Sequence, residues 1–262
     1  MKKTKILKEI KENIRENKST FIVYLILRGL VVAALLVSLG RGDFESAFVC
    51  ALSLILFLLP AFFERQFGMR LPFALEIVIL LFIFASQILG ELAYYYVKIP
   101  HFDTLLHTVN GFIFAAVGFA LTDILNKSER VKFELSPIYT VVVAFCFSMS
   151  IGVFWEFFEF GVDYFLDTDM QKDKILGEIS SIVFDTKGLN RTIHINNITE
   201  LSINGGEYII NGYVDIGLYD TMKDLFVNFI GAAIFCISGF FYLKNRGKGK
   251  LARLFIPTKR EQ

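Results

Sequence analysis

Acidic residues, two asparagines and one histidine recur at helical spacing in three apolar stretches of this sequence. The stretches read "DTLLHTVNG", "WEFFEFGVD" and "DTMKDLFVN", and in each the polar residues follow one another every three or four positions. Such spacing puts side chains on one face of an α-helix, because the helix turns once in 3.6 residues. The residues are Asp103, His107 and Asn110, then Glu156, Glu159 and Asp163, then Asp220, Asp224 and Asn228.

These residue types could bind a metal ion. Carboxylate oxygens together with one imidazole suit Zn, Mn, Fe or Mg. Glu156 and Glu159 lie in the last turns of their predicted helix, where the helix dipole disfavours acids, and a buried carboxylate there needs a cation or a proton to compensate it. Few Lys or Arg residues are near, so the pattern favours a divalent metal ion, or protonation of the carboxylates, as the compensation. A proton- or substrate-binding pocket and plain structural hydrogen bonding are the alternatives.

Each candidate residue has an expected role. We expect Glu156 and Glu159 to be catalytic, as general bases that also bind the metal. Asp103 and Asp220 begin helices, where an acid would equally well cap free N–H groups. The predicted metal ligands are Asp103, His107, Glu156, Glu159, Asp220 and Asp224, and the predicted substrate-binding residues are Glu91, Asn110, Asp163 and Asn228.

The composition predicts that the helices carrying these residues cross a membrane. Hydrophobic residues make up 54% of the 262 residues, and 29 residues are Phe. Several runs reach the ~20 apolar residues needed to span a bilayer core. The sequence therefore predicts an all-α polytopic membrane protein with six transmembrane helices, over about 21–39, 46–63, 71–95, 104–125, 137–161 and 222–243.

Basic segments flank the predicted membrane part, and a long insertion interrupts it. We expect a basic N-terminal segment over 1–20, helices one to five over 21–163, an insertion over 164–219, helix six over 220–243 and a basic tail over 244–262. Alternating apolar and polar residues around Asn204-Gly205-Gly206 predict a β-hairpin or meander in the insertion. The stretch 170–184 before it is expected to form a short helix.

The distribution of Lys and Arg predicts the orientation. Nineteen of these residues fall on the side of the two termini and seven on the side of the insertion. Because basic loops stay in the cytoplasm, we expect a plasma (cell inner) membrane protein with cytoplasmic termini and an extracytoplasmic insertion. The basic segments would bind anionic inner-leaflet lipid rather than nucleic acid.

The polar motifs resemble those of a known family. "DTLLHTVNG", "WEFFE" and "DTMKDLFVNFIGA", in this order, are similar to the YjdF-type family of bacterial integral membrane proteins, whose function is unknown. The frame of an Asp-His helix, a Glu helix and an Asp-Asn helix also resembles, in part, the VanZ-like family, which is linked to glycopeptide tolerance through the cell envelope. The resemblance covers about residues 100–235. Matched to the family motif, the positions are Asp103, His107, Gly111, Glu156, Glu159, Asp220, Asp224, Asn228 and Gly231.

Three functions fit this pattern. The first is a metal-dependent membrane enzyme acting on an envelope lipid or a lipid-linked phosphate, with the metal activating water. The second is a proton- or cation-coupled transporter that uses the same carboxylates. The third is a non-catalytic cell-envelope factor. No Gly-x-Ser-x-Gly, P-loop or His-Glu-x-x-His motif is present, so those enzyme classes have no support.

Overall fold

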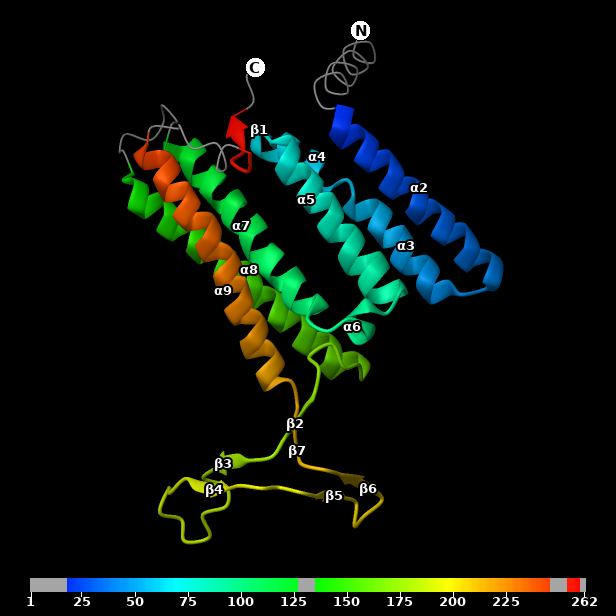
Figure 1. The fold of residues 1–262 in the computed structure, drawn as a ribbon, viewed down its shortest axis with the longest axis vertical. Coiled ribbons are helices and arrows are strands. Elements are labelled where there is room, and N and C mark those ends of the chain that lie inside the picture. Colours follow the sequence, from blue (N-terminus) through cyan, green and yellow to red (C-terminus); the bar gives the residue numbers. More distant parts are fainter. Residues whose placement is uncertain (1–17, 127–134, 246–253, 260–262) are drawn as a thin grey trace. The chain divides into compact units, whose positions relative to one another are not determined.

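Six helices of the protein are long and apolar enough to cross a membrane. They appear in a computed structural model that describes residues 18–126, 135–245 and 254–259. The fold is helical apart from small two-stranded sheets, which confirms the predicted fold class (Figure 1). The six spans are Lys18–Arg41, Phe44–Phe67, Phe73–Leu92, Phe102–Asn126, Pro137–Leu166 and Leu218–Lys244.

Two of the spans are interrupted helices. The second consists of two helices separated by Phe57 and Leu58, ahead of Pro60, which lacks the N–H that a helix interior needs. The third continues from a regular helix into a π-helix. The helices are α2 (Lys18–Arg41), α3 (Phe44–Leu56), α4 (Leu59–Phe67), α5 (Phe73–Phe84), the π-helix η1 (Ala85–Leu92), α6 (Tyr95–Lys98), α7 (Phe102–Asn126), α8 (Pro137–Leu166) and α9 (Leu218–Lys244).

The span predicted over 71–95 is confirmed as Phe73–Leu92, but its second half is a π-helix. The π-helix η1 occupies 85–92, and Tyr94 then adopts a left-handed backbone with φ of 61°. A packing contact goes with this change, since the ring of Tyr96 lies where a Cβ on Gly90 would be. Short π-helical segments inside α-helices often occur at functional sites. Glu91 and Gln87 both lie in η1.

The chain forms two compact units, and the first consists of Met1–Gly152 and Val227–Gln262. In this unit α2 contacts α3 and α5, while α5 contacts α7. Two clusters of buried apolar side chains form its core. The first cluster lies between α5, α7, α8 and α9 and includes Leu75, Phe119, Val141, Ala144 and Phe235. The second lies between α2, α3, α5 and η1 and includes Leu27, Val31, Cys50, Leu80 and Ile88.

A pair of short strands joins two distant segments of the first unit. Strand β1 (Met69–Arg70) follows α4, which ends at Gly68 in the left-handed conformation. It pairs antiparallel with β8 (Thr258–Lys259) near the C-terminus. The link between the second and third spans therefore lies at the same end of this unit as the described part of the C-terminal tail (Figure 1).

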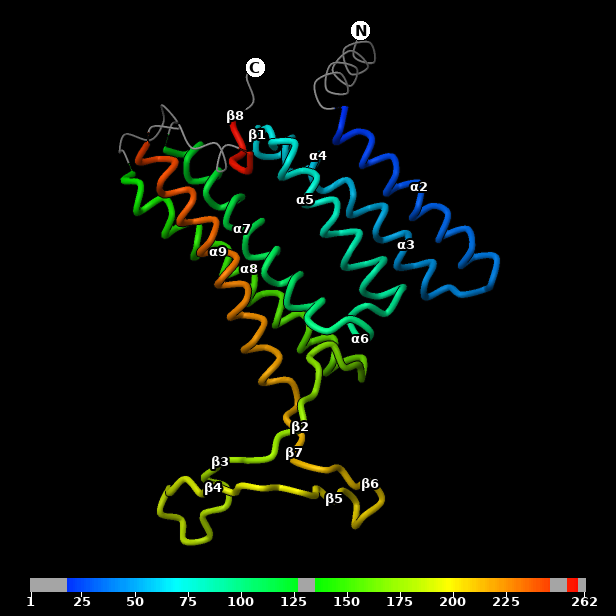
Figure 2. Tube along the Cα trace, viewed as in Figure 1, coloured from blue at the N-terminus to red at the C-terminus, as the bar shows by residue number. Residues whose placement is uncertain are grey.

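The second unit, Val153–Phe226, contains the insertion between α8 and α9. Its six short strands pair antiparallel as β2 with β7, β3 with β4, and β5 with β6, and Figure 2 traces the chain through them. The bounds are β2 (Lys174–Leu176), β3 (Ile179–Ser181), β4 (Ile193–Ile195), β5 (Leu201–Ile203), β6 (Tyr208–Ile210) and β7 (Tyr213–Asp215).

The insertion is β-rich as predicted, and one of its hairpins has the predicted turn. Asn204, Gly205 and Gly206 connect β5 to β6, with φ values of 52°, 71° and 104° that glycine and asparagine tolerate best. The expected helix over 170–184 is wrong, because this stretch supplies β2 and β3 instead. Both strands pair with partners further along the chain, β7 and β4, and a sequence window cannot reveal such pairing.

Candidate metal centre

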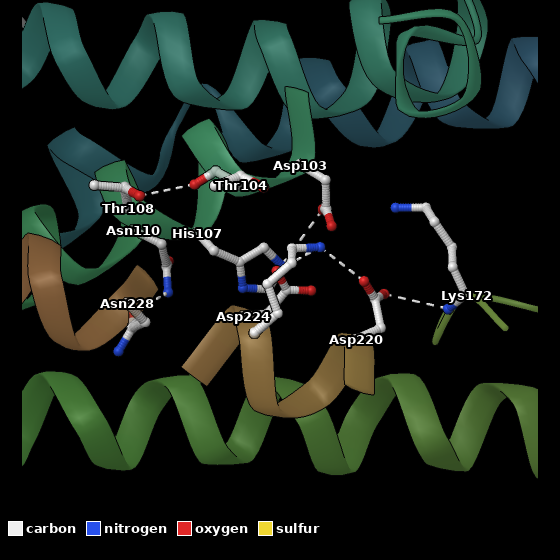
Figure 3. A network of polar contacts seen from close by, with 10 residues as sticks. Asp103, Thr104, His107, Thr108, Asn110, Lys172, Asp220, Asp224 and Asn228 are labelled. Atoms are coloured by element: carbon white, nitrogen blue, oxygen red, sulfur yellow. Dashed lines mark hydrogen bonds and ion pairs between the residues drawn. The ribbon is translucent and has the colours of Figure 1, made fainter. Parts of the chain in front are cut away.

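The first turns of α7 carry the only histidine of the three polar motifs. This helix begins at Phe102, so Asp103 lies in its first turn, where the positive end of the helix dipole favours an acid. His107 is one turn further and is buried, with 8% of its surface exposed. Its Nε2 atom lies 3.5 Å from Oδ1 of Asp103. The two predicted ligands on this helix therefore meet, as Figure 3 shows.

Two acids are buried on α8 among exposed aromatic side chains. Glu156 is 4% exposed and Glu159 is 8% exposed, although both lie in the second half of a helix that runs to Leu166. Their neighbours Phe157 and Phe158 are more than half exposed, at 65% and 54%. In a membrane, aromatic side chains on that surface would face lipid, while the two carboxylates point to the protein interior.

The first turns of α9 add a third group of polar side chains. Asp224 is 2% exposed and Asn228 is 1% exposed. Between the acids of this helix lies Lys223, whose Nζ atom is 2.8 Å from Oδ1 of Asp220 and 3.3 Å from Oδ1 of Asp224. Asp220 also accepts a hydrogen bond of 3.2 Å from the backbone N–H of Lys172 (Figure 3).

Five of the predicted residues, four of them buried and Asp103 half-buried, form a group that could hold a metal ion. The donor atoms of Asp103, His107 and Asp224 all lie within 4.8 Å of one another, and so do those of His107, Glu156 and Glu159. Among the residues that the structure describes, these are the two such sets, and the imidazole belongs to both. One imidazole with carboxylate oxygens is a donor set that Zn, Mn, Fe and Mg all accept.

Three other predicted residues have different surroundings. Asp163 accepts hydrogen bonds from the Thr168 hydroxyl at 2.7 Å and from the backbone N–H groups of Met170 and Gln171 at 2.6 and 2.8 Å. It thus fixes the turn that follows α8. Asp220 belongs to neither metal-binding set, and Glu91 is exposed on η1. The metal role of Asp220 and the substrate-binding roles of Asp163 and Glu91 stay predictions.

The two predicted asparagines contact each other. Nδ2 of Asn110 on α7 donates to Oδ1 of Asn228 on α9 over 3.2 Å, as Figure 3 shows. Asn228 also lies against α8, where its Nδ2 is 3.5 Å from the carbonyl oxygen of Ser148. The spacing rule found both asparagines but could not show that they pair. Their substrate-binding role stays a prediction.

Sequence reasoning missed Ser148. The hydroxyl of Ser148 on α8 donates to the carbonyl oxygen of Gly111 on α7 over 2.8 Å. Ser148 lies eight residues before Glu156, and therefore on the same face of α8, which is a signal that could have identified it. Lys223 is three residues after Asp220, so helical spacing already places its ammonium group beside that acid.

Comparison with known proteins identifies the family. The family described as "Predicted membrane protein (DUF2238)" matches residues 22–245, which includes all six spans apart from the first four residues of the first span. The chain belongs to this family. That match agrees with the predicted multi-pass membrane protein of unknown function, while the finer resemblance to YjdF-type and VanZ-like proteins stays a prediction.

Comparison also finds a distant relative of this DUF2238 protein. An "Uncharacterized protein" of Thermotoga maritima is 24% identical over 129 residues, which is 49% of this chain. The match covers 65% of the length of that relative. No solved structure matches the chain. The function of this family member must therefore be argued from its own residues.

Proposed function

We propose that this membrane protein binds one divalent metal ion and is a metal-dependent hydrolase of a lipid-linked phosphate or a related envelope lipid. The observation that carries the proposal is the buried group in which the donor atoms of His107, Glu156 and Glu159 lie within 4.8 Å of one another. Asp103 and Asp224 complete a second set around the same imidazole. One ion beside His107 could draw on both sets.

The charge balance of the buried group supports a cation. Glu156, Glu159 and Asp224 are each less than a tenth exposed. Keeping such carboxylates inside a membrane protein is costly unless positive charge or protons compensate them. The charged group that lies 3.3 Å from Asp224 is Lys223, whose own side chain is 44% exposed. A divalent ion would compensate two carboxylates at once.

The chemistry of the group fits hydrolysis of a phosphate ester. A divalent ion supplies charge that polarises a phosphoryl oxygen and lowers the pKa of bound water. Glu156 or Glu159 would take a proton from the attacking water as its oxygen bonds to phosphorus, and would return it to the alcohol oxygen that leaves. The exposed Phe side chains of α8 provide an apolar surface for the lipid chain.

The proposal includes the cellular setting. We place the protein in the plasma membrane with both termini in the cytoplasm, where the basic segments 1–20 and 244–262 would bind anionic lipid. Most of these segments lies outside the described residues. The support is the excess of Lys and Arg on the side of the termini.

Metal content of the purified protein tests the proposal. Mass spectrometry on detergent-purified wild type should find about one equivalent of a divalent metal, and His107→Ala and Glu156→Ala should each lose it. Asp185→Ala, in the insertion, is the matched control and should keep the metal. If the wild-type protein stays metal-free after Zn, Mn, Fe and Mg are added, the proposed metal-dependent hydrolase function is contradicted. Proton-coupled transport through the same carboxylates would then be the function to test.

A further inference from the structure

A polar joint connects three membrane helices within the first unit. Its centre is Asn228 on α9, which is 1% exposed. The carboxamide of Asn228 accepts from Asn110 on α7 at 3.2 Å and directs its Nδ2 toward the carbonyl oxygen of Ser148 on α8 at 3.5 Å. Ser148 in turn donates to the carbonyl oxygen of Gly111 on α7 at 2.8 Å. One small set of side chains therefore links α7, α8 and α9.

Glycines make this joint tight. A Cβ on Gly152 of α8 would lie 2.8 Å from Nδ2 of Asn228, closer than real side chains pack. A Cβ on Gly111 of α7 would meet the backbone carbonyl of Asn228 itself. The carboxamide therefore packs closely against α8 at Gly152, and the backbones of α7 and α9 approach closely at Gly111.

The joint lies one helical turn from a candidate ligand on each of its three helices. Asn228 is four residues after Asp224, Gly111 is four residues after His107, and Gly152 is four residues before Glu156. Four residues correspond to about 6 Å along a helix axis. Rotation or sliding of any of these helices at the joint would therefore move its ligand by a similar amount.

We propose that Asn228 is a positioning residue, which fixes the rotation and register of α7, α8 and α9 so that His107, Glu156 and Asp224 meet at one metal ion. This inference rests on the proposed metal-binding function. Metal sites depend on their supporting groups, and removal of such a group costs roughly 10–100-fold in metal affinity. Asn228 thereby acts on the metal through the helices and does not bind the ion itself.

Metal titration of matched variants tests the inference. Asn228→Leu removes the carboxamide, while Gly152→Ala keeps every polar group and displaces the joint with one methyl group. Gly161→Ala is the control, because Gly161 lies on the same helix with nothing within 4 Å of its position. Co²⁺ and Zn²⁺ would be titrated into metal-free protein in detergent, with the visible absorption of Co²⁺ reporting the coordination.

We expect Asn228→Leu and Gly152→Ala each to weaken Zn²⁺ binding about tenfold or more. They should also change the Co²⁺ spectrum, since a displaced ligand alters coordination number. Gly161→Ala should match wild type in both measurements. Should Asn228→Leu fail to fold, Gly152→Ala gives the same test with all polar groups in place.

The outcomes separate the two proposals. A wild type that binds no metal would overturn the proposed function and this inference together. A wild type that binds metal, with folded Asn228→Leu and Gly152→Ala proteins that bind it equally well and give an unchanged Co²⁺ spectrum, would overturn the positioning role alone. In that case a lowered melting temperature of these variants would assign Asn228 a purely structural role.

Discussion

At the scale of single residues, Lys223 lies where a cation is expected. Its ammonium group is 2.8 Å from Asp220 and 3.3 Å from Asp224, and Asp224 belongs to one of the two metal-binding sets. A metal ion and an ammonium group near the same carboxylate repel each other. The lysine stem is long and partly exposed, so its charge can move toward water when an ion binds.

Replacing Lys223 with methionine should therefore strengthen metal binding. Lys223→Met keeps the apolar stem and removes the charge, and we expect the metal dissociation constant to fall several-fold because no ammonium group competes for Asp224. Competitive titration with a coloured Zn²⁺ chelator measures this. Lys174→Met is the control, since that lysine lies over the ring of Tyr219 at 5.0 Å and touches neither acid in the part of the chain that the structure describes. Weaker binding in Lys223→Met would show instead that the lysine supports the site.

The residue scale also shows what the sequence could predict of the site. Periodicity is enough to place Asp103 beside His107 and Glu156 beside Glu159, because a helix fixes the neighbours of every residue on its own face. Contacts between helices follow from helix register, which depends on many packing contacts at once. The pairing of Asn110 with Asn228 is therefore a result of the structure.

At the scale of elements, glycine governs how closely the helices approach. A Cβ on Gly231 of α9 would meet the backbone carbonyl of Thr108 on α7. Hydrogen bonds between membrane helices contribute only about 0.6 kcal/mol on average. Close backbone packing at Gly111 and Gly231 should therefore stabilise the pair of α7 and α9 more than the Asn110–Asn228 hydrogen bond does.

Gly231→Ala should destabilise the protein by about 1–3 kcal/mol, as overpacking of a tight contact does. The added methyl group forces α7 and α9 apart, so the melting temperature in detergent should fall. Gly29→Ala is the matched control, because Gly29 is in the membrane helix α2 with nothing within 4 Å. That variant should be as stable as wild type, since alanine is the better helix former. Equal melting temperatures for the two variants would show that α7 and α9 do not pack through Gly231.

Hydropathy and helix periodicity predicted the six spans, since a membrane allows few alternatives to a long apolar helix. The same reasoning could not reveal the π-helix at 85–92, because its apolar composition also suits a regular helix. It also failed at β2 and β3, where pairing with later strands decides the structure. The sequence pattern of a segment therefore predicts its secondary structure well only where that structure does not depend on pairing with distant segments.

At the scale of the whole molecule, the sidedness of the chain is the property on which the function depends. The six candidate spans of the described residues would put Lys18, at the start of the first span, and Lys244, at the end of the sixth, on one side of the membrane. The antiparallel pairing of Met69 and Arg70 with Thr258 and Lys259 agrees with this parity, because it joins the link after the second span to the tail after the sixth. By the same parity, the insertion after the fifth span is predicted to lie on the opposite side of the membrane.

The distribution of Lys and Arg predicts which side of the membrane faces the cytoplasm, and cysteine labelling can test this prediction. Nineteen Lys and Arg residues lie on the side of the termini against seven on the side of the insertion, so the termini should be cytoplasmic. Of the native cysteines, Cys146 is exposed and would be changed to serine, while Cys50 and Cys236 are buried. A membrane-impermeant maleimide should then label Lys187→Cys in intact spheroplasts, but label Asn245→Cys only after permeabilisation. Lys187 and Asn245 are both exposed, so the two positions differ in sidedness and not in accessibility.

The reverse labelling result would place the candidate metal centre near the cytoplasmic face. Asp103 lies near the end of its helix that follows the link before α7, and Glu159 and Asp224 lie near the ends of their helices that join the insertion. The substrate would then have to be sought among lipids of the inner leaflet.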